Sequence, residues 1–407
     1  MKPITHINPT TWRIAAFTAV IILFAAACSF TSTATPTPTP EIPPVTPTEG
    51  ALEPTPTEPP PSSTDLPAAL YLLSKDAGDL FQVWRISQDR STTTQMTSEP
   101  ENVDEFAVNP ITGQIAYLTN DQVFIINADT TGRTLLIDGS TADQTSDEYF
   151  FREKIAGLSW NNEGTQLAYG QNGLNLYTLA SSTSEKIIEN ELEEQDSGFI
   201  FPRAIYSPLN WSPDGSLMLV DVGFYEGGTI NIFSPASGEV TQLGEGIVCC
   251  HPTWSPDSGS IVVASPFIGM ISSGLWRYDV NTGAQTELIP TTSENNILNF
   301  AGWPVVLPDG QLQFFYGITG DFPGGDVPLQ MVRTAPDGQS NLTVVRNEDW
   351  LNYEVLWSPD GRLAVTVQPI PGVEAGWPRI GPVVLLPASE DGVDPLGING
   401  YQLQWGP

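Results

Sequence analysis

Basic residues are scarce in this sequence. Its 407 residues include 15 Lys and Arg against 47 Asp and Glu, so the formal net charge at pH 7 is -32. Nucleic-acid binding requires clusters of basic side chains that neutralise phosphates, and the sequence contains no such cluster. An acidic membrane surface would repel the chain for the same reason. The charge therefore excludes these two surfaces as direct partners and favours solubility.

Histidine is nearly absent, which restricts the catalytic chemistry. The sequence has His6, in the N-terminal signal region, and His251. A Ser-His-Asp triad would have to use His251, and neither a Gly-x-Ser-x-Gly motif nor a Gly-rich phosphate loop is present. The acidic stretch 189–196 lacks regular calcium-loop spacing and is expected to be a solvated loop. We expect no cofactor and no metal.

Cysteine is also rare, and two of the three cysteines are adjacent. Cys249 and Cys250 directly precede His251. A strained disulfide between the neighbours suits an oxidising compartment and is the favoured interpretation. The alternatives are a redox or metal site that includes His251, for which one short triplet supplies few ligands, and two unreactive thiols.

The third cysteine, Cys28, ends an N-terminal signal. Lys2 and Arg13 precede an apolar stretch, residues 14–27, that closes with three alanines. This pattern predicts a secretory signal over residues 1–27. A Cys directly after small residues resembles the lipobox of bacterial lipoproteins and implies lipidation of Cys28, although Ala25 stands where Leu is most usual. The alternative is an uncleaved transmembrane anchor, for which the stretch is short of the roughly 20 residues needed.

A tether follows the signal. Residues 31–64 are almost entirely Thr, Pro, Ser and Glu, a composition that adopts extended polyproline II and buries no core. We therefore expect residues 28–64 to form a disordered tether. The remaining residues, 65–407, would be held outside the cytoplasm on the outer side of the cell membrane, with the anchor as the only membrane contact.

The folded part repeats a tetrapeptide. Trp-Ser-Pro-Asp occurs at residues 211–214, 254–257 and 357–360, and looser copies follow Val108, Trp160, Trp303 and Trp405. Self-similarity at a period of roughly 40–50 residues is typical of repeat architectures. Pro presets the second turn position and Gly takes the positive φ, so Asp214, Asp257, Asp309 and Asp360 are expected to close hairpins. The Trp side chains are expected to pack between repeats.

Each repeat contains four short strands bounded by Gly, Pro, Asn and Asp. Four-stranded units of this length build the blades of a β-propeller. The last segment, 401–405, is expected to form the first strand of a blade whose second, third and fourth strands are the segments at 69–73, 81–86 and 95–97. Pairing the two ends in one blade would close the ring without a free sheet edge. The sequence thus predicts an all-β, seven-bladed β-propeller of four-stranded antiparallel blades, with six or eight blades as alternatives.

These repeats resemble the TolB-type propeller repeat, a close relative of WD40 repeats, whose hallmark is a Trp/Phe-Ser-Pro-Asp-Gly turn before an apolar strand. The resemblance covers roughly residues 68–407 and implies the fold, with little information on function. TolB itself has an additional α/β domain before its propeller, for which this sequence shows no counterpart. The partnership of TolB with a cell-envelope lipoprotein is therefore not carried over.

Function is expected on one face of the propeller. Antiparallel strands place the short Ser-Pro-Asp-Gly turns on one face and the long irregular loops on the other, and aromatic residues gather on the long loops. We expect a monomeric binding module whose partner is an envelope protein, a peptide or a glycan. A carbohydrate-active hydrolase or lyase is the alternative, because catalytic carboxylates meet in space rather than in sequence. The candidate ligand-binding residues are Phe224, Tyr225, His251, Phe267, Phe322 and Trp377.

Overall fold

A computed structural model of the chain describes residues 65–139, 151, 153–196, 198–225, 227–244, 250–267, 272–320, 326–373, 376–389 and 392–407. The segment Ser62–Pro407 is one compact unit. The expected signal and tether, residues 1–64, lie outside the described residues. Within the described part, the structure contains no helix of the length and apolarity needed to cross a membrane.

The described residues form six antiparallel sheets. Three regular four-stranded sheets come from the first half of the chain and its middle. They contain, in chain order, β4 (Val103–Val108), β5 (Ile115–Thr119), β6 (Gln122–Ile126) and β7 (Thr134–Asp138); β8 (Ala156–Trp160), β9 (Gln166–Gly170), β10 (Gly173–Thr178) and β11 (Thr183–Glu189); and β17 (Thr253–Trp254), β18 (Ser260–Ser265), β19 (Gly274–Asp279) and β20 (Gln285–Ile289).

A fourth four-stranded sheet follows the 3-10 turn η2 (Glu294–Asn296), and the two remaining sheets are larger. The fourth contains β21 (Leu298–Val306), β22 (Leu312–Thr319), β23 (Gln330–Thr334) and β24 (Thr343–Val344). The five-stranded sheet contains β12 (Glu191–Glu194), β13 (Ile200–Trp211), β14 (Met218–Phe224), β15 (Gly227–Ser234) and β16 (Glu239–Gln242). The seven-stranded sheet is ordered β25 (Glu354–Trp357), β26 (Leu363–Val367), β27 (Gly381–Pro387), β28 (Asp394–Gly406), β1 (Ala69–Lys75), β2 (Phe81–Ile86) and β3 (Thr93–Gln95).

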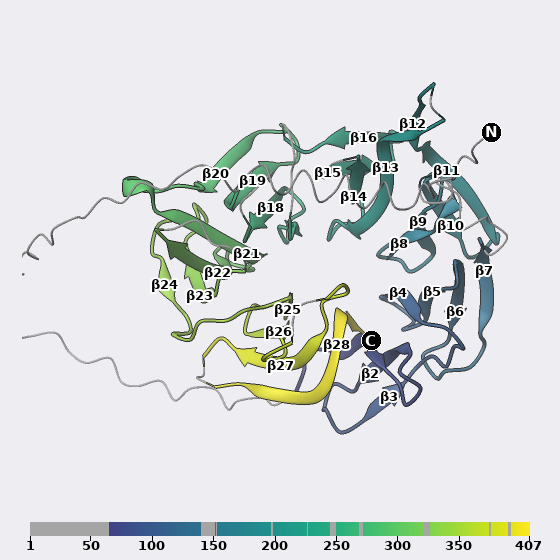
Figure 1. Cartoon of the computed structure of the whole chain (residues 1–407), viewed down its shortest axis with the longest axis horizontal. Coiled ribbons are helices and arrows are strands. Elements are labelled where there is room, and N and C mark those ends of the chain that lie inside the picture. Colours follow the sequence, from purple (N-terminus) through teal and green to yellow (C-terminus); the bar gives the residue numbers. More distant parts are fainter. Residues whose placement is uncertain are drawn as a thin grey trace, which may run out of the picture. The chain divides into compact units, whose positions relative to one another are not determined.

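The sheets follow one another in chain order around a common centre (Figure 1). In this view β4 and β8 lie toward the centre, whereas β7, β20 and β24 lie at the periphery. Neighbouring sheets bury apolar side chains between them: Tyr71 and Val83 pack with Phe106 and Tyr117 in one cluster. The architecture is all-β, and its four-stranded antiparallel sheets are consistent with propeller blades.

The Ser-Pro-Asp turns close hairpins, as expected. Ser212 Oγ donates to Asp214 Oδ1 at 2.6 Å, and the backbone N–H of Ser216 donates to the same oxygen at 3.0 Å. These bonds hold the pKa of Asp214 down at about 2. Gly215 takes the positive φ of 73° that the turn requires. Ser255 with Asp257, and Ser358 with Asp360, repeat the same hydroxyl–carboxylate bond.

Three tryptophans of the repeat each donate a hydrogen bond to the inner strand of the preceding repeat. Trp160 Nε1 donates to the carbonyl of Ala107 at 3.1 Å, and Trp357 Nε1 donates to the carbonyl of Trp303 at 2.7 Å. Trp405 Nε1 donates to the carbonyl of Trp357 at 2.8 Å. The expected packing role of these three side chains is therefore confirmed, and each indole also satisfies its polar atom.

The structure corrects the repeat register around Trp303. Val306 pairs with Leu312, just as Trp211 pairs with Met218 in the equivalent hairpin. Val306 thus occupies the position that Trp takes in other repeats, and Trp303 lies three residues before it. The prediction was wrong because Trp303 and Val306 both precede the Leu-Pro-Asp-Gly turn. The Trp was taken for the repeat position since most other repeats have Trp there.

Strand β28 explains why six sheets form where seven separate blades were predicted. Its first half pairs with β27, for example Gly400 with Gly381, and its second half pairs with β1. The single strand therefore joins two groups of strands into the seven-stranded sheet. The expected pairing of residues 401–405 with the segment at 69–73 is present, with Trp405 opposite Leu70.

A further difference concerns the acidic stretch 189–196, which was expected to be a solvated loop. Residues Glu191–Glu194 instead form β12, which pairs with the start of β13. Strand β13 is long, at 12 residues, and extends beyond its sheet to provide this partner. Backbone pairing with an apolar strand outweighed the weak strand preference of three glutamates.

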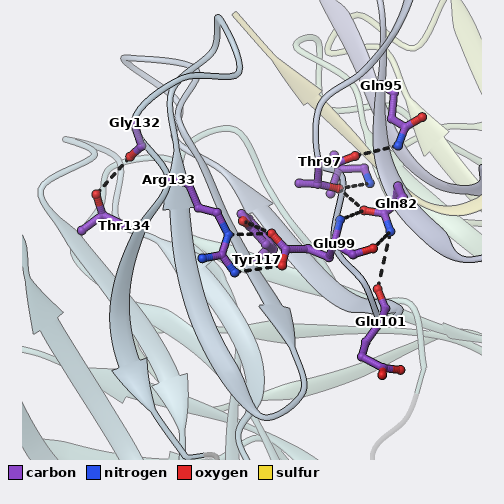
Figure 2. A network of polar contacts seen from close by, with 10 residues as sticks. Gln82, Gln95, Thr97, Glu99, Glu101, Tyr117, Gly132, Arg133 and Thr134 are labelled. Atoms are coloured by element: carbon purple, nitrogen blue, oxygen red, sulfur yellow. Dashed lines mark hydrogen bonds and ion pairs between the residues drawn. The ribbon is translucent and has the colours of Figure 1, made fainter.

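A buried polar network joins the link after β3 to the next sheet (Figure 2). The guanidinium of Arg133 donates to both carboxylate oxygens of Glu99 at 2.7 and 2.8 Å, and the Tyr117 hydroxyl donates to Glu99 Oε1 at 2.7 Å. Gln82 accepts from the backbone N–H of Glu99 at 3.0 Å and from the Thr97 hydroxyl at 2.8 Å. Bidentate, charge-assisted bonds of this kind are the strong ones in a protein interior.

Candidate functional site

A pocket of about 780 Å³ lies where the first strands of several groups begin. We call it the axial pocket, and we call the side of the molecule that carries the long loops the loop face. The volume is in the range of small-ligand sites. The axial pocket is lined by Asp104, Glu105, Leu118, Asn120, Asp121, Lys154, Ile155, Ala156, Tyr353, Glu354, Trp377, Pro378, Arg379 and Tyr401.

Local strand geometry explains the position of the pocket. Glu105 belongs to β4, Ala156 begins β8, Glu354 begins β25 and Tyr401 lies in β28. Each of these strands runs from the loop face toward a Ser-Pro-Asp turn or its counterpart. Glu105, Ala156, Glu354 and Tyr401 therefore converge on one pocket. The loop between β26 and β27 adds Trp377 and Arg379 to its mouth.

Two glutamates of the pocket hold neighbouring strands together. The carboxylate of Glu105 accepts from the backbone N–H groups of Gly157 and Leu158 at 2.9 and 2.7 Å. Glu354 repeats the arrangement with the backbone N–H groups of Gln402 and Leu403, both at 2.6 Å. In each carboxylate both oxygens are used. Gly157 and Gln402 have positive φ, of 71° and 54°, which turns these N–H groups toward the glutamate.

Burial and hydrogen bonding act in opposite directions on the pKa values of the acids in the pocket. Burial raises the pKa of Glu105 and of Glu354, while the two backbone donors on each lower it. Burial also raises the pKa of Asp104, against the charge of Lys154, which lowers it. Burial, with Asp104 and Glu354 nearby, raises the pKa of Tyr401 to about 12, so its hydroxyl keeps its proton at neutral pH.

Aromatic side chains form one wall of the pocket. Trp377 is 91% exposed, which is extreme for an indole. Arg379 lies over the ring of Tyr353 at 5.2 Å and over that of Phe267 at 5.9 Å, and it pairs with Asp326 at 3.2 Å. A second pocket of about 720 Å³ shares Tyr353, Trp377 and Pro378 with the first and adds Phe81 and Lys75. An exposed aromatic beside two adjoining pockets is typical of a binding surface.

A separate aromatic group lies at the β12–β13 hairpin. Phe201 stacks on Tyr225 with ring centroids 4.9 Å apart, and Phe199 meets Tyr225 edge-on at 5.9 Å. Phe224 and Tyr225 line a shallow hollow of about 500 Å³ together with Phe201, Pro202 and Arg203. Arg203 covers the ring of Phe201 and pairs with Glu193. The hairpin is the feature that the five-stranded sheet adds to the repeat.

No protein-family model matches the chain. No curated protein matches it either. Among solved structures, it is similar to TolB from Acinetobacter baumannii, at 15% identity over 79% of this chain and 77% of that one, with a TM-score of 0.39. A prolyl endopeptidase structure has 11% identity over 84% of this chain and 50% of that one, with a TM-score of 0.53.

A puromycin-hydrolyzing peptidase from Mycobacterium tuberculosis gives 11% identity over 80% of this chain and 53% of that one, with a TM-score of 0.50. The chain thus spans about half the length of each peptidase structure. At such identities a likeness shows the fold alone. Together with the repeated four-stranded sheets, it decides the architecture. The fold is a β-propeller.

The propeller brings only some of the predicted site residues together. Trp377 lines the axial pocket, and Phe267 reaches its edge through Arg379. Phe224 and Tyr225 lie apart, at the hairpin hollow. The roles of these residues in ligand binding stay predictions.

His251 has an internal position in the propeller. Its ring stacks on Trp303 with centroids 4.5 Å apart, and its Nδ1 accepts from the backbone N–H of Trp303 at 3.3 Å. Burial lowers the pKa of His251 to about 3, so the ring is neutral at pH 7. His251 thus accepts a backbone N–H group of the neighbouring sheet, as Glu105 and Glu354 do. Its role in ligand binding stays a prediction.

The cysteine predictions lie largely beyond the described part of the chain. Cys28 and Cys249 are outside the described residues, as is Phe322. Cys250 takes part in a disulfide. Its backbone N–H and carbonyl pair with Ala264 at 3.2 Å each, so it extends the inner edge of that sheet. Among the described residues no three His, Cys, Asp or Glu side chains cluster in a way that could hold a metal ion.

Sequence reasoning missed the acidic and phenolic residues of the axial pocket. Glu105, His251 and Glu354 stand three residues before the Trp position of their repeats, as do Trp303 and Gln402. A comparison of the repeats would have found a polar or aromatic residue at this position in five of seven copies. Asp104, Tyr353 and Tyr401 carry no such signal, since they come from distant segments that only the folded chain brings to one pocket.

Proposed function

We propose that this chain is an extracytoplasmic binding module that takes its ligand on the loop face, at the axial pocket. The observation that carries the proposal is the exposed Trp377 at the mouth of a pocket of about 780 Å³ lined by strand ends of the rigid scaffold. A rigid scaffold that presents loop side chains is the usual arrangement of a binding site. The partner is an envelope protein, a peptide or a glycan.

We further propose that the ring has seven blades and is closed by the two chain ends. The support comes from β28, whose halves pair with different strands, so that β25, β26, β27 and the start of β28 form one blade. The end of β28 with β1, β2 and β3 forms the next. Leu70 and Leu72 of β1 pack against Val365 and Val383, as neighbouring blades do elsewhere.

The N-terminal segment gives this module its location in our proposal. Lipidated Cys28 would anchor it to the outer side of the cell membrane, and the Thr- and Pro-rich segment would hold it away from the bilayer. At about 3.1 Å per residue, the segment of residues 31–64 would reach on the order of 100 Å when extended. That reach would bring the loop face within range of envelope partners.

A carbohydrate-active hydrolase or lyase is the competing function, and the raised pKa values of Glu105 and Glu354 are the observation in its favour. A general acid must give a proton to its substrate. Both oxygens of each carboxylate already accept backbone hydrogen bonds between strands. Their geometry therefore supports a structural role, and binding is the better-supported function.

Capture experiments test the proposal. The full chain in non-ionic detergent would be used to capture partners from envelope extracts and on a glycan array, beside Trp377→Ala and the control Ile111→Ala. Ile111 is also exposed, at 64%, but lies in the β4–β5 turn. We expect Trp377→Ala to lose the captured partner and Ile111→Ala to retain it. Equal capture by all three proteins would rule out the axial pocket as the site.

A further inference from the structure

We propose that the axial pocket binds an organic cation, namely an ammonium or guanidinium group. The group could be carried by a small amine or by a Lys or Arg side chain of a peptide. The inference rests on the proposed binding function of the same pocket and specifies the chemistry of its ligand. It is carried by the charges, the hydrogen bonds and the aromatic faces at the pocket.

The pocket has an excess of negative charge. Its lining contains four carboxylates, Asp104, Glu105, Asp121 and Glu354, against the two cationic side chains of Lys154 and Arg379. Arg379 is already paired with Asp326 outside this lining, at 3.2 Å. A cation that enters would therefore meet a net attractive field, which the overall charge of -32 reinforces at long range.

Three of the four carboxylates are fixed in place. Glu105 and Glu354 each accept two backbone N–H groups, and Asp121 Oδ1 accepts from the backbone N–H of Ile155 at 2.9 Å. The strands hold these carboxyl groups in position before a ligand arrives. Binding of a cationic ligand would therefore require little reorganisation of the site.

Asp104 is the carboxylate left to contact the ligand. Among the described residues, no hydrogen bond ends on its side chain, whereas the other three acids are engaged. Burial raises the pKa of Asp104, with the charge of Lys154 acting in the opposite direction. Asp104 is exposed on β4, so its carboxylate can reach a cation with N–H groups and form charge-assisted hydrogen bonds with it.

The aromatic residues complete the recognition of a cation. Faces of Tyr and Trp attract ammonium and guanidinium groups, most strongly where water is excluded. The chain already uses this pattern twice, once beside the axial pocket and once in the adjoining pocket. Arg379 lies over Tyr353 at 5.2 Å while it pairs with Asp326, and Lys75 lies over Phe81 at 5.5 Å while it pairs with Asp79 at 2.8 Å. Trp377, at 91% exposure, is open to a further cation.

Calorimetry with charged and neutral probes tests the inference on the full chain in non-ionic detergent. The probes are N-acetyl-arginine amide, its uncharged analogue N-acetyl-citrulline amide, and tri-arginine. We expect the arginine amide to bind at least about tenfold more tightly than the citrulline amide, since one charge-assisted pair is worth at least that factor. Tighter binding of tri-arginine would identify a peptide as the source, and equal binding would identify a small cation.

Two variants and a control locate the binding. Asp104→Asn should weaken arginine amide about tenfold, and Trp377→Ala should weaken it several-fold. Glu239→Gln, an exposed charge change on the outer strand β16, should leave binding unchanged. Raised salt should weaken binding to the parent protein and have less effect on Asp104→Asn.

The outcomes separate this inference from the proposed function. Equal affinity for arginine and citrulline amides, no effect of Asp104→Asn, or no binding of arginine amide at millimolar concentration would overturn the cation as ligand. If Trp377→Ala still abolished capture of an envelope partner or glycan, the pocket would remain the binding site. If the cation results were negative and Trp377→Ala also left the capture of an envelope partner or glycan intact, both the cation inference and the proposed function would fail.

Discussion

Trp405 lies directly opposite Leu70 in the antiparallel pairing of β28 with β1. Among the described residues, the last strand is thus paired with the first, and two further bonds secure it. The Tyr71 hydroxyl donates to the carbonyl of Pro407 at 3.2 Å, and Trp405 Nε1 donates to the carbonyl of Trp357 at 2.8 Å. The contacts of one strand therefore hold together segments from the two ends of the folded region.

Deletion of residues 401–407 should strongly destabilise the propeller. The deletion would expose the edge of β1 and uncover Leu70 and Tyr71, both of which are fully buried. Loss of this much apolar burial corresponds to more than about 3 kcal/mol, and the free edge would favour association between chains. Chemical denaturation and size-exclusion chromatography measure the two effects.

A milder change controls for this experiment. Trp405→Phe keeps the strand and most of the packing but removes the Nε1 donor, so we expect a loss of about 1 kcal/mol. An unchanged denaturation midpoint in the deleted chain would contradict closure by strand pairing. A loss as large for Trp405→Phe as for the deletion would assign the effect to the indole alone.

Gly157 should be intolerant of a side chain. It adopts a φ of 71°, and a Cβ there would meet Pro208 Cδ at 2.8 Å and the Pro208 carbonyl oxygen at 3.0 Å. Gly157→Ala should therefore lose about 1 kcal/mol for the backbone conformation and more for the clash. Gly238→Ala is the matched control, because Gly238 has a φ of 73° but open space around it. Equal denaturation midpoints for the two variants would show that the contact with Pro208 is unimportant.

The sequence predicts best what is encoded within a few residues. The turn at Ser212 and Asp214 forms through its own side chains, and the same set of bonds recurs at Ser255 and Ser358. Periodicity then predicts the sheets and even the pairing of the two ends, because the last repeat supplies only a first strand and the N-terminal segment lacks one. The register around Trp303 was wrong, since a prominent residue type was taken for the repeat position that Val306 fills.

The candidate site was predicted much less completely. Trp377 could be proposed from sequence because it stands in a long loop. Asp104, Tyr353 and Tyr401 come from three distant segments, and only strand pairing and blade packing bring them to one pocket. The strand at Glu191–Glu194 was missed because its stability comes from the pairing with β13 and not from its own residues.

The Glu99–Arg133 pair should make stability depend on pH. Burial of the Glu99 carboxyl raises its pKa, but the hydrogen bonds from Arg133 and Tyr117 and the charge of Arg133 outweigh this and hold the pKa below its ordinary value of 4.5. The folded state therefore binds this proton less readily than the unfolded state. The stabilisation is complete above about pH 4.5 and is lost as the pH falls through the lowered pKa of Glu99.

Glu99→Gln tests this dependence. At pH 7 we expect a loss of about 1–2 kcal/mol, because a buried charged pair is broken but Arg133 is 46% exposed and screened by water. The gap between variant and parent should narrow below about pH 4.5. Urea denaturation at a series of pH values, with the exposed Glu239→Gln as control, provides the measurement. A gap that is constant with pH would contradict the ionic role of Glu99.

Acylation of Cys28 is expected if the N-terminal segment acts as a lipoprotein signal. Globomycin treatment of an expressing bacterium, or the substitution Cys28→Ala, should change both the electrophoretic mobility of the protein and its partition into detergent. Cys249→Ala serves as the control for loss of a thiol. Unaltered mobility and partition after both treatments would refute lipidation and favour the uncleaved anchor.

The adjacent cysteines should be oxidised to a disulfide with each other in the mature protein. Cys250 is disulfide-bonded, and Cys249 and Cys28 are the other cysteines of the sequence. If Cys28 carries lipid, its sulfur is in a thioether and is not available for pairing.

Alkylation without reductant should then add no label, whereas reduction should raise the intact mass by two hydrogens and permit two labels. A Cys28→Ala variant with the same behaviour would assign the bond to Cys249, because only the neighbouring thiol would remain. Two labels on the unreduced protein would contradict the disulfide and return the pair to free thiols.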